Sequence, residues 1–165
     1  LALESRDGAP FYHVHGAGAI DCRHMNEHLT NAGADLSGTP ELEVREYIRD
    51  MNVLMRAADL VICRAGASTI SELTALGQPA IIVPSPNVVH NNQEHNARVL
   101  ADAGGAEMIL EKDCSGELLF KTACAILKDR DRRRRMSVAM ASLGSIDAAE
   151  NIYSAIIALQ GRRKK

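Results

Sequence analysis

The chain has 165 residues, which is enough for one domain that buries an apolar core without disulfides. Its net charge is −2, so overall charge gives no attraction to nucleic acid. The sequence has no Trp, three Tyr and two Phe, which argues against an aromatic platform for single-stranded nucleic acid. No apolar run reaches the roughly 18 residues of a membrane-spanning helix. The composition therefore favours a globular domain that binds neither nucleic acid nor the interior of a bilayer.

Short apolar runs alternate with stretches of helical spacing along the whole chain. The runs at 60–63 and 80–83 are continuous, as in strands of a parallel sheet that are buried on both faces. Gly and Pro residues separate most of the segments. The expected strands are 11–15, 44–48, 60–63, 80–83 and 106–110, and the expected helices are 22–31, 52–57, 68–76, 91–103, 118–127, 132–143 and 148–159.

This alternation predicts an α/β fold, a Rossmann-like doubly wound parallel sheet with helices on both faces. We expect residues 1–160 to form a single domain and residues 161–165 to form a basic tail. Ligands of open parallel sheets bind beyond the C-terminal ends of the strands. The loops expected there carry Arg64, Ser68, Thr69, Glu72, His90, Asn92 and Gln93.

Residues 59–77 predict what such a site would hold. The strand at 60–63 stops at Arg64-Ala65-Gly66-Ala67, and helical spacing resumes at Ile70 and Leu73. A strand that leads through small residues into a helix directs free backbone N–H groups and the positive end of the helix dipole at one point. The segment therefore predicts a phosphate site.

Each of these residues also has a structural explanation. Thr69 and Glu72 have the spacing of a capping box, and Ser68 or Thr69 could simply cap the helix. Arg64 could pair with a neighbouring carboxylate, and the polar residues near Asn92 and Gln93 could be a solvated first turn.

The remaining charged and sulfur-containing residues suggest no site of their own. Acidic residues interrupt the basic run at 128–135, so a solvated helix face is favoured over a patch for lipid headgroups. The four cysteines lack metal-ligand spacing, and Cys63 and Cys124 fit reduced core positions. The cysteines thus indicate no metal site, and we expect no cofactor.

Four segments of the sequence, at 46–51, 59–77, 92–93 and 147–149, resemble the MurG family of peptidoglycan glycosyltransferases, glycosyltransferase family 28. Residues 46–51 (EYIRDM) are similar to its FI-D-M segment, and residues 59–77 to its ADLVICRAGA-T-SEL-A-G-P signature. Asn92-Gln93 and the DAA at 147–149 match two further family segments. The resemblance implies the C-terminal, donor-binding half of a GT-B enzyme. The family transfers N-acetylglucosamine from UDP-GlcNAc to lipid I, undecaprenyl-diphospho-muramoylpentapeptide, at the cytoplasmic face of the membrane, without a metal.

The resemblance also implies roles for individual residues. Ile48 would meet uracil through its backbone, and Glu72 would accept hydrogen bonds from the ribose hydroxyls. The first turn of the helix at 68–76 would contact the diphosphate, with Arg64 neutralising its charge, and Gln93 beside Asn92 would hold GlcNAc hydroxyls. The implied donor-binding residues are Ile48, Arg64, Ala67, Ser68, Thr69, Ile70, Ser71, Glu72, Asn92 and Gln93.

The sequence departs from the family pattern in two respects. The family domain opens with a strand and a GGSLGA-type glycine loop, which residues 1–10 do not contain, and Asn92 stands where the family often has His or Gln. The acceptor surface, the membrane surface and the general base belong to the family's N-terminal domain. We therefore expect no catalytic residue in this chain, no activity on its own, and, in a longer protein, a cytoplasmic enzyme peripheral to the membrane.

Two other functions remain open from the residues alone. One is a stand-alone donor-binding subunit of a two-chain N-acetylglucosaminyltransferase. The other is half of a sugar-nucleotide epimerase, or a noncatalytic nucleotide-binding module.

Overall fold

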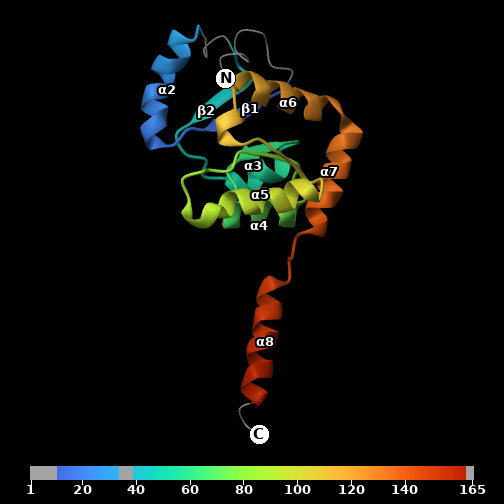
Figure 1. The fold of residues 1–165 in the computed structure, drawn as a ribbon. Helices are drawn as coiled ribbons and strands as arrows, with labels where there is room; N and C mark the ends of the chain where they lie inside the picture. Colours follow the sequence, from blue (N-terminus) through green and yellow to red (C-terminus); the bar gives the residue numbers. More distant parts are fainter. Residues whose placement is uncertain (1–10, 34–38, 163–165) are drawn as a thin grey trace.

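A computed structural model of the chain describes residues 11–33 and 39–162 (Figure 1). Every helix and strand expected from the sequence is present, with ends that differ by a few residues. The elements are β1 (His13–Gly16), α2 (Ala19–Asn31), β2 (Leu42–Arg45), α3 (Met51–Ala57), β3 (Val61–Cys63), α4 (Ala67–Leu76), β4 (Ala80–Ile82), the 3-10 helix η1 (Val89–Asn91), α5 (Asn92–Asp102), β5 (Ala106–Met108), the 3-10 helix η2 (Glu111–Asp113), α6 (Gly116–Lys128), α7 (Arg130–Ser142) and α8 (Ala148–Arg162).

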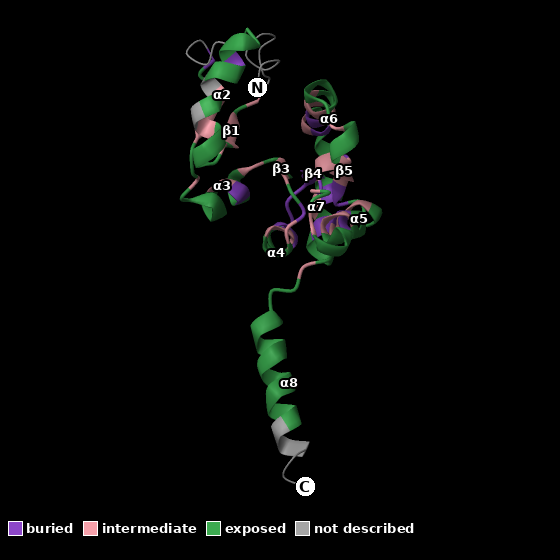
Figure 2. Cartoon of the chain, turned by 60° about the vertical axis from the view of Figure 1, so that its left-hand side comes forward, coloured by how far each residue is buried: buried purple, intermediate pink, exposed green. Residues whose placement is uncertain are grey.

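All described strands pair in parallel, which confirms the α/β prediction. They form two sheets, however, of order β1-β2 and β3-β4-β5. Among the described strands, β1 bonds only to β2, and β3 bonds to β4 on one side. Figure 2 shows β1, α2 and α3 on one side of the molecule and β3, β4 and β5 on the other. The sequence therefore predicted the class of fold, and the described part of the chain divides the expected single sheet into two.

The core is built around the middle strand β4. Ile81 and Ile82 are both 0% exposed, and because successive residues of a strand point to opposite faces, they enter two different apolar clusters. Ile82 packs with a cluster that includes Leu73 of α4 and Leu100 of α5. Ile81 packs with a cluster that includes Ile126 of α6. Helices therefore cover both faces of the three-stranded sheet, as expected from the sequence.

The strand β3 is less buried than its apolar sequence predicts. Ile62 is 41% exposed although it is the middle residue of the strand. A strand with a partner on one side only leaves its other edge uncovered, so the prediction that 60–63 is buried on both faces is wrong for Ile62.

The last helix stands apart from both sheets. Figures 1 and 2 show α8 extending away from the rest of the molecule, and residues 148–159 are all exposed. The helix continues to Arg162, so the expected tail at 161–165 begins inside α8, and 163–165 lie outside the described residues. Within the described ranges, no helix is long and apolar enough to cross a bilayer.

Candidate functional site

The turn between β3 and α4 has free backbone donors. Gly66 is the N-cap of α4, in extended conformation, and no side chain caps the helix. The N–H groups of Ala67, Ser68 and Thr69 precede the first intrahelical donor, because the first bond of the helix runs from Ile70 N to Gly66 O, and no described residue accepts from them. The start of α4 therefore presents three N–H groups and the positive end of its dipole at the C-terminal end of β3.

The structure removes the capping-box explanation for Glu72. Thr69 is the third residue of α4 and not its N-cap, since Gly66 holds that position. Glu72 is exposed, and no described residue bonds its carboxylate. Ser71 is exposed on the same turn, and its hydroxyl donates to Ala67 O at 3.0 Å. Ile70, by contrast, packs against the core, so its side chain serves the fold.

Arg64 spans the ends of three strands. It follows β3, and its Nη1 donates both to Val83 O, just after β4, at 3.1 Å and to Glu111 Oε2, just after β5. The expected alternative for Arg64, an ion pair with a carboxylate, is therefore present in the structure. The Glu111 partner lies 47 positions away, and the sequence analysis did not identify it. Its position directly beyond the end of the 106–110 strand was the signal that could have found it.

Gln93 connects the turns that follow β3 and β4. Its Oε1 accepts from Ser85 N at 2.9 Å and from Ala65 N at 3.3 Å, and Asn96 Nδ2 donates to Ala65 O at 3.3 Å. The amide oxygen of Gln93 is thus committed to backbone, and its Nε2 bonds no described residue. The structure therefore leaves Gln93 as a hydrogen-bond donor, not an acceptor, toward a ligand.

The segment before α5 has an unusual backbone. His90 and Asn91 have φ angles of 56° and 53°, in the left-handed region that non-glycine residues seldom adopt. Asn91 Nδ2 donates to Glu94 Oε2 at 2.7 Å, and Arg98 pairs with the same carboxylate. The bond from Asn91, and then the one from Arg98, lower the pKa of Glu94. Asn92 follows as the exposed first residue of α5.

Ile48 lies in a loop and not in the expected strand 44–48. The ladder between β1 and β2 ends where Gly16 pairs with Arg45, and the chain then turns toward α3. The side chain of Ile48 is partly buried, and its Cδ1 lies 3.2 Å from where a Cβ on Gly16 would be, so only glycine fits there without a shift. The backbone of Ile48 thus lies in the short loop between β2 and α3, outside the strand ladder.

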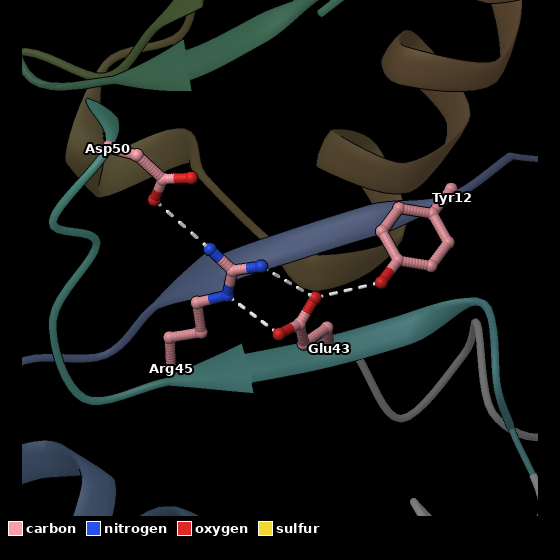
Figure 3. Close-up of polar contacts among 4 residues, drawn as sticks. All are labelled: Tyr12, Glu43, Arg45 and Asp50. Atoms are coloured by element: carbon pink, nitrogen blue, oxygen red, sulfur yellow. Dashed lines mark hydrogen bonds and ion pairs between the residues drawn. The ribbon is translucent and has the colours of Figure 1, made fainter. Parts of the chain in front are cut away.

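A group of four polar side chains, which we call the β2 polar cluster, extends from Tyr12 along β2 to Asp50 at the end of this loop (Figure 3). Arg45 Nε and Nη2 donate to Glu43 at 2.6 and 3.1 Å, Tyr12 Oη donates to Glu43 Oε2 at 2.8 Å, and Arg45 Nη1 donates to Asp50 Oδ1 at 3.3 Å. The bond from Arg45, and then the one from Tyr12, lower the pKa of Glu43, while the bond to Glu43 raises the pKa of Tyr12. The pair of Arg45 and Asp50 joins the two ends of the loop that contains Ile48.

Other features of the described residues lie outside this site. A cavity of about 400 Å³ lies beside β5 and is lined by residues such as Gly104, Glu107 and Arg135, none of which is among the expected donor residues. Within the described ranges no three His, Cys, Asp or Glu residues are grouped to hold a metal. Burial raises the pKa of the Cys63 thiol to about 11, so this thiol stays protonated at neutral pH.

Residues 4–152 match the glycosyltransferase family 28 C-terminal domain. A UDP-N-acetylglucosamine--N-acetylmuramyl-(pentapeptide) pyrophosphoryl-undecaprenol N-acetylglucosamine transferase of Acetivibrio thermocellus is 48% identical over 118 residues, which are 72% of this chain and 32% of the relative. A relative of the same name from Anaeromyxobacter sp. (strain K) is 42% identical over 150 residues, 91% of this chain and 38% of the relative.

The fold is similar to that of solved glycosyltransferases. The crystal structure of Acinetobacter baumannii MurG matches with a TM-score of 0.77 and 28% identity, over 95% of this chain and 48% of that one. A glycotransferase of kitacinnamycin matches in fold, with a TM-score of 0.66 and 21% identity over 92% of this chain and 37% of that one. The chain thus spans about a third of the length of the curated relatives that it matches.

Proposed function

Because the chain belongs to the C-terminal domain family of glycosyltransferase family 28, we propose that it is the donor-binding part of an N-acetylglucosaminyltransferase. The donor would be UDP-N-acetylglucosamine, the sugar nucleotide that the names of its relatives contain. The observation that carries the proposal is the start of α4. Its three free N–H groups lie at the C-terminal end of a parallel strand, beside an arginine and an amide donor.

The proposed donor would lie along the turns that follow the strands. The backbone of Ile48 would meet uracil, and the exposed carboxylate of Glu72 would accept bonds from the ribose hydroxyls. The first turn of α4 would bind the diphosphate through backbone N–H groups and the hydroxyls of Ser68 and Thr69. Asn92 and the Nε2 of Gln93 would donate to hydroxyl oxygens of the sugar.

This arrangement suits the departure of UDP from the sugar. As the bond from the sugar to the β-phosphate breaks, negative charge grows on the phosphate oxygens. Donors that are already oriented toward that charge stabilise it without reorganisation, as in an oxyanion hole. The N–H groups of α4 and the guanidinium of Arg64 would supply this stabilisation.

We propose that the complete transfer needs a further domain. The chain covers about a third of its curated relatives, so lipid I, the general base and the surface that meets the membrane would belong to the rest of a longer protein. That protein would act at the cytoplasmic face of the membrane. This chain alone would hold the donor and transfer nothing. No contact among the described residues favours a stand-alone subunit or an epimerase over this function.

The proposal is tested by titrating the chain with UDP-GlcNAc in a calorimeter or by NMR. We expect Glu72→Ala to weaken binding by about ten-fold, since it removes a charged acceptor of two hydroxyl bonds. The matched control is Glu150→Ala, which removes an exposed carboxylate from α8 and should leave binding unchanged. Equal affinity of Glu72→Ala and the wild type would contradict the ribose assignment.

A further inference from the structure

We propose that Glu111 is a positioning residue that orients Arg64 toward the diphosphate. The inference depends on the proposed function, because it assigns a role within the same donor site. Neither the family signature nor the strand-end residues expected from the sequence include Glu111. Its assignment comes from the contacts of Arg64 alone.

The Arg64 side chain lies across the ends of three neighbouring strands. Arg64 follows β3, Val83 follows β4 and Glu111 follows β5, and these three strands are neighbours in one sheet. The guanidinium bonds Val83 O and Glu111 Oε2. The side chain therefore lies across the C-terminal edge of the sheet, which is the edge where ligands of such folds bind.

The guanidinium of Arg64 keeps hydrogen-bond donors that no described residue uses. A guanidinium has five N–H groups, two of them on Nη1. Both bonds in the structure come from Nη1, so its two hydrogens are committed to Val83 O and Glu111. The Nε and Nη2 edge, with the other three hydrogens, bonds no described residue. That edge has the planar geometry with which arginine binds two phosphate oxygens at once.

Glu111 gives Arg64 a second acceptor beside the carbonyl of Val83. The Arg64 side chain is 52% exposed, so the core does not fix its conformation. A single carbonyl acceptor leaves the guanidinium free to rotate about that bond, whereas a second acceptor on the same nitrogen fixes the plane. Removal of Glu111 would therefore return conformational freedom to Arg64, and the ligand would have to restrict it again on binding.

Charge repulsion between Glu111 and an anionic ligand would change UDP affinity in the opposite direction. Glu111 is 40% exposed and carries a negative charge beside a site for an anion. If repulsion of the ligand outweighed the positioning of Arg64, then removing the carboxylate would tighten binding. The direction of the change therefore decides between the two.

The experiment measures the affinities of UDP and uridine for the wild-type chain and its variants by calorimetry at low salt. We expect Glu111→Ala to weaken UDP binding by about three- to ten-fold, because Arg64 keeps its bonds to the diphosphate but the ligand must restrict its side chain. Uridine has no phosphate, so its affinity should not change. Glu111→Gln keeps an oxygen acceptor for Nη1 and should stay within about two-fold of the wild type.

Two controls separate positioning from general effects of charge and folding. Glu117→Ala removes an exposed carboxylate from the first turn of α6 and changes the net charge equally, so it should leave UDP binding unchanged. Addition of Glu111→Ala to an Arg64→Ala variant should have no further effect on UDP, because the residue that Glu111 positions is then absent. A merely structural role of Glu111 would still weaken binding in that double variant.

Tighter or unchanged UDP binding by Glu111→Ala would overturn the inference and leave the proposed function intact, provided that the wild type binds UDP. A wild-type chain that binds neither uridine nor UDP would overturn the proposed function itself. An equal loss of UDP affinity in Glu111→Gln and Glu111→Ala would also overturn the inference, because an acceptor oxygen at this position would then make no difference.

Discussion

The two sheets carry different parts of the candidate site and are stabilised in different ways. In the β3-β4-β5 sheet, apolar clusters cover both faces, and Ala65, in the turn toward α4, is completely buried. Around the β1-β2 sheet, the buried apolar residues among those described are Leu29 of α2 and Leu42, and the polar side chains that fix the loop at Ile48 are partly or fully exposed. The proposed diphosphate and sugar end of the site thus rests on a packed core, and the proposed uracil end rests on partly exposed ion pairs.

This difference has a consequence for binding. Turns that are anchored by core packing and by buried backbone bonds keep their geometry without the ligand. Ion pairs on the surface contribute little to stability and weaken as salt increases. We therefore expect the diphosphate end to be preorganised and the uracil end to respond to ionic strength.

The largest expected effect tests the packed sheet. Leu73 of α4 is fully buried beside β4, so Leu73→Ala should lower the free energy of unfolding by about 2–5 kcal/mol through the cavity that it leaves. Leu42→Ala, in the smaller sheet, should lower the free energy of unfolding by less than Leu73→Ala does. Leu159→Ala, on the exposed α8, is the control and should cost almost nothing. Urea denaturation followed by circular dichroism measures all three, and equal costs for Leu73 and Leu42 would remove the distinction between the two sheets.

The next effect concerns the hydrogen bond that connects α3, after the β1-β2 sheet, with the end of α4 in the packed region. Gln78, just after α4, is buried, and its Nε2 donates to Met55 O at 2.5 Å, near the end of α3. Gln78→Leu leaves this carbonyl without its partner and should cost about 1–3 kcal/mol in urea denaturation. Because α3 follows the loop that contains Ile48, uridine affinity should fall as well. If stability falls and uridine affinity does not, then this bond does not join the uracil end to the packed sheet.

A third effect comes from Cys63, the last residue of β3. Its thiol pKa is raised to about 11, whereas the thiol of the unfolded chain ionises about two pH units lower. Below both pKa values the thiol is protonated in both states, and as pH rises between them only the unfolded state loses its proton. Stability should therefore fall by about 1 kcal/mol by pH 10, and less in Cys63→Ala. Denaturation at pH 8 and pH 10 measures this, with Cys22→Ala as the control. An equal fall in the wild type and in Cys63→Ala would show that β3 does not shield the thiol.

The sequence predicted the packed region better than the other. Alternation of apolar runs with helical spacing was enough to place β3, α4, β4 and α5, and the small residues at 65–67 indicated a turn with free N–H groups. These are local properties, and periodicity reports them directly. The same reasoning placed the second strand at 44–48. The structure instead ends β2 at Arg45, where pairing with β1 stops.

The contacts of site residues were the least predictable from the sequence. Glu111 meets Arg64 across 47 positions, and the Oε1 of Gln93 bonds backbone N–H groups of two different turns. Neither contact has a local sequence pattern, because each depends on how neighbouring strands align in the sheet. The exposure of Ile62 has the same origin, since the apolar character of a strand does not report how many neighbours it has.

The smallest expected effect tests the uracil end. Arg45→Met removes the partner of both Glu43 and Asp50 while keeping an extended side chain, so it should release the loop at Ile48 and leave the packed sheet intact. The pKa of Glu43 should rise, because the bond from Arg45 is the main cause of its lowering, and NMR titration measures it. Uridine affinity should fall by about two-fold at low salt, and the difference from the wild type should shrink at high salt, since surface pairs are screened. The matched control is Arg98→Met, which breaks an exposed pair with Glu94 on α5. A loss of uridine affinity that salt does not reduce would mean that the uracil end is as firmly packed as the diphosphate end.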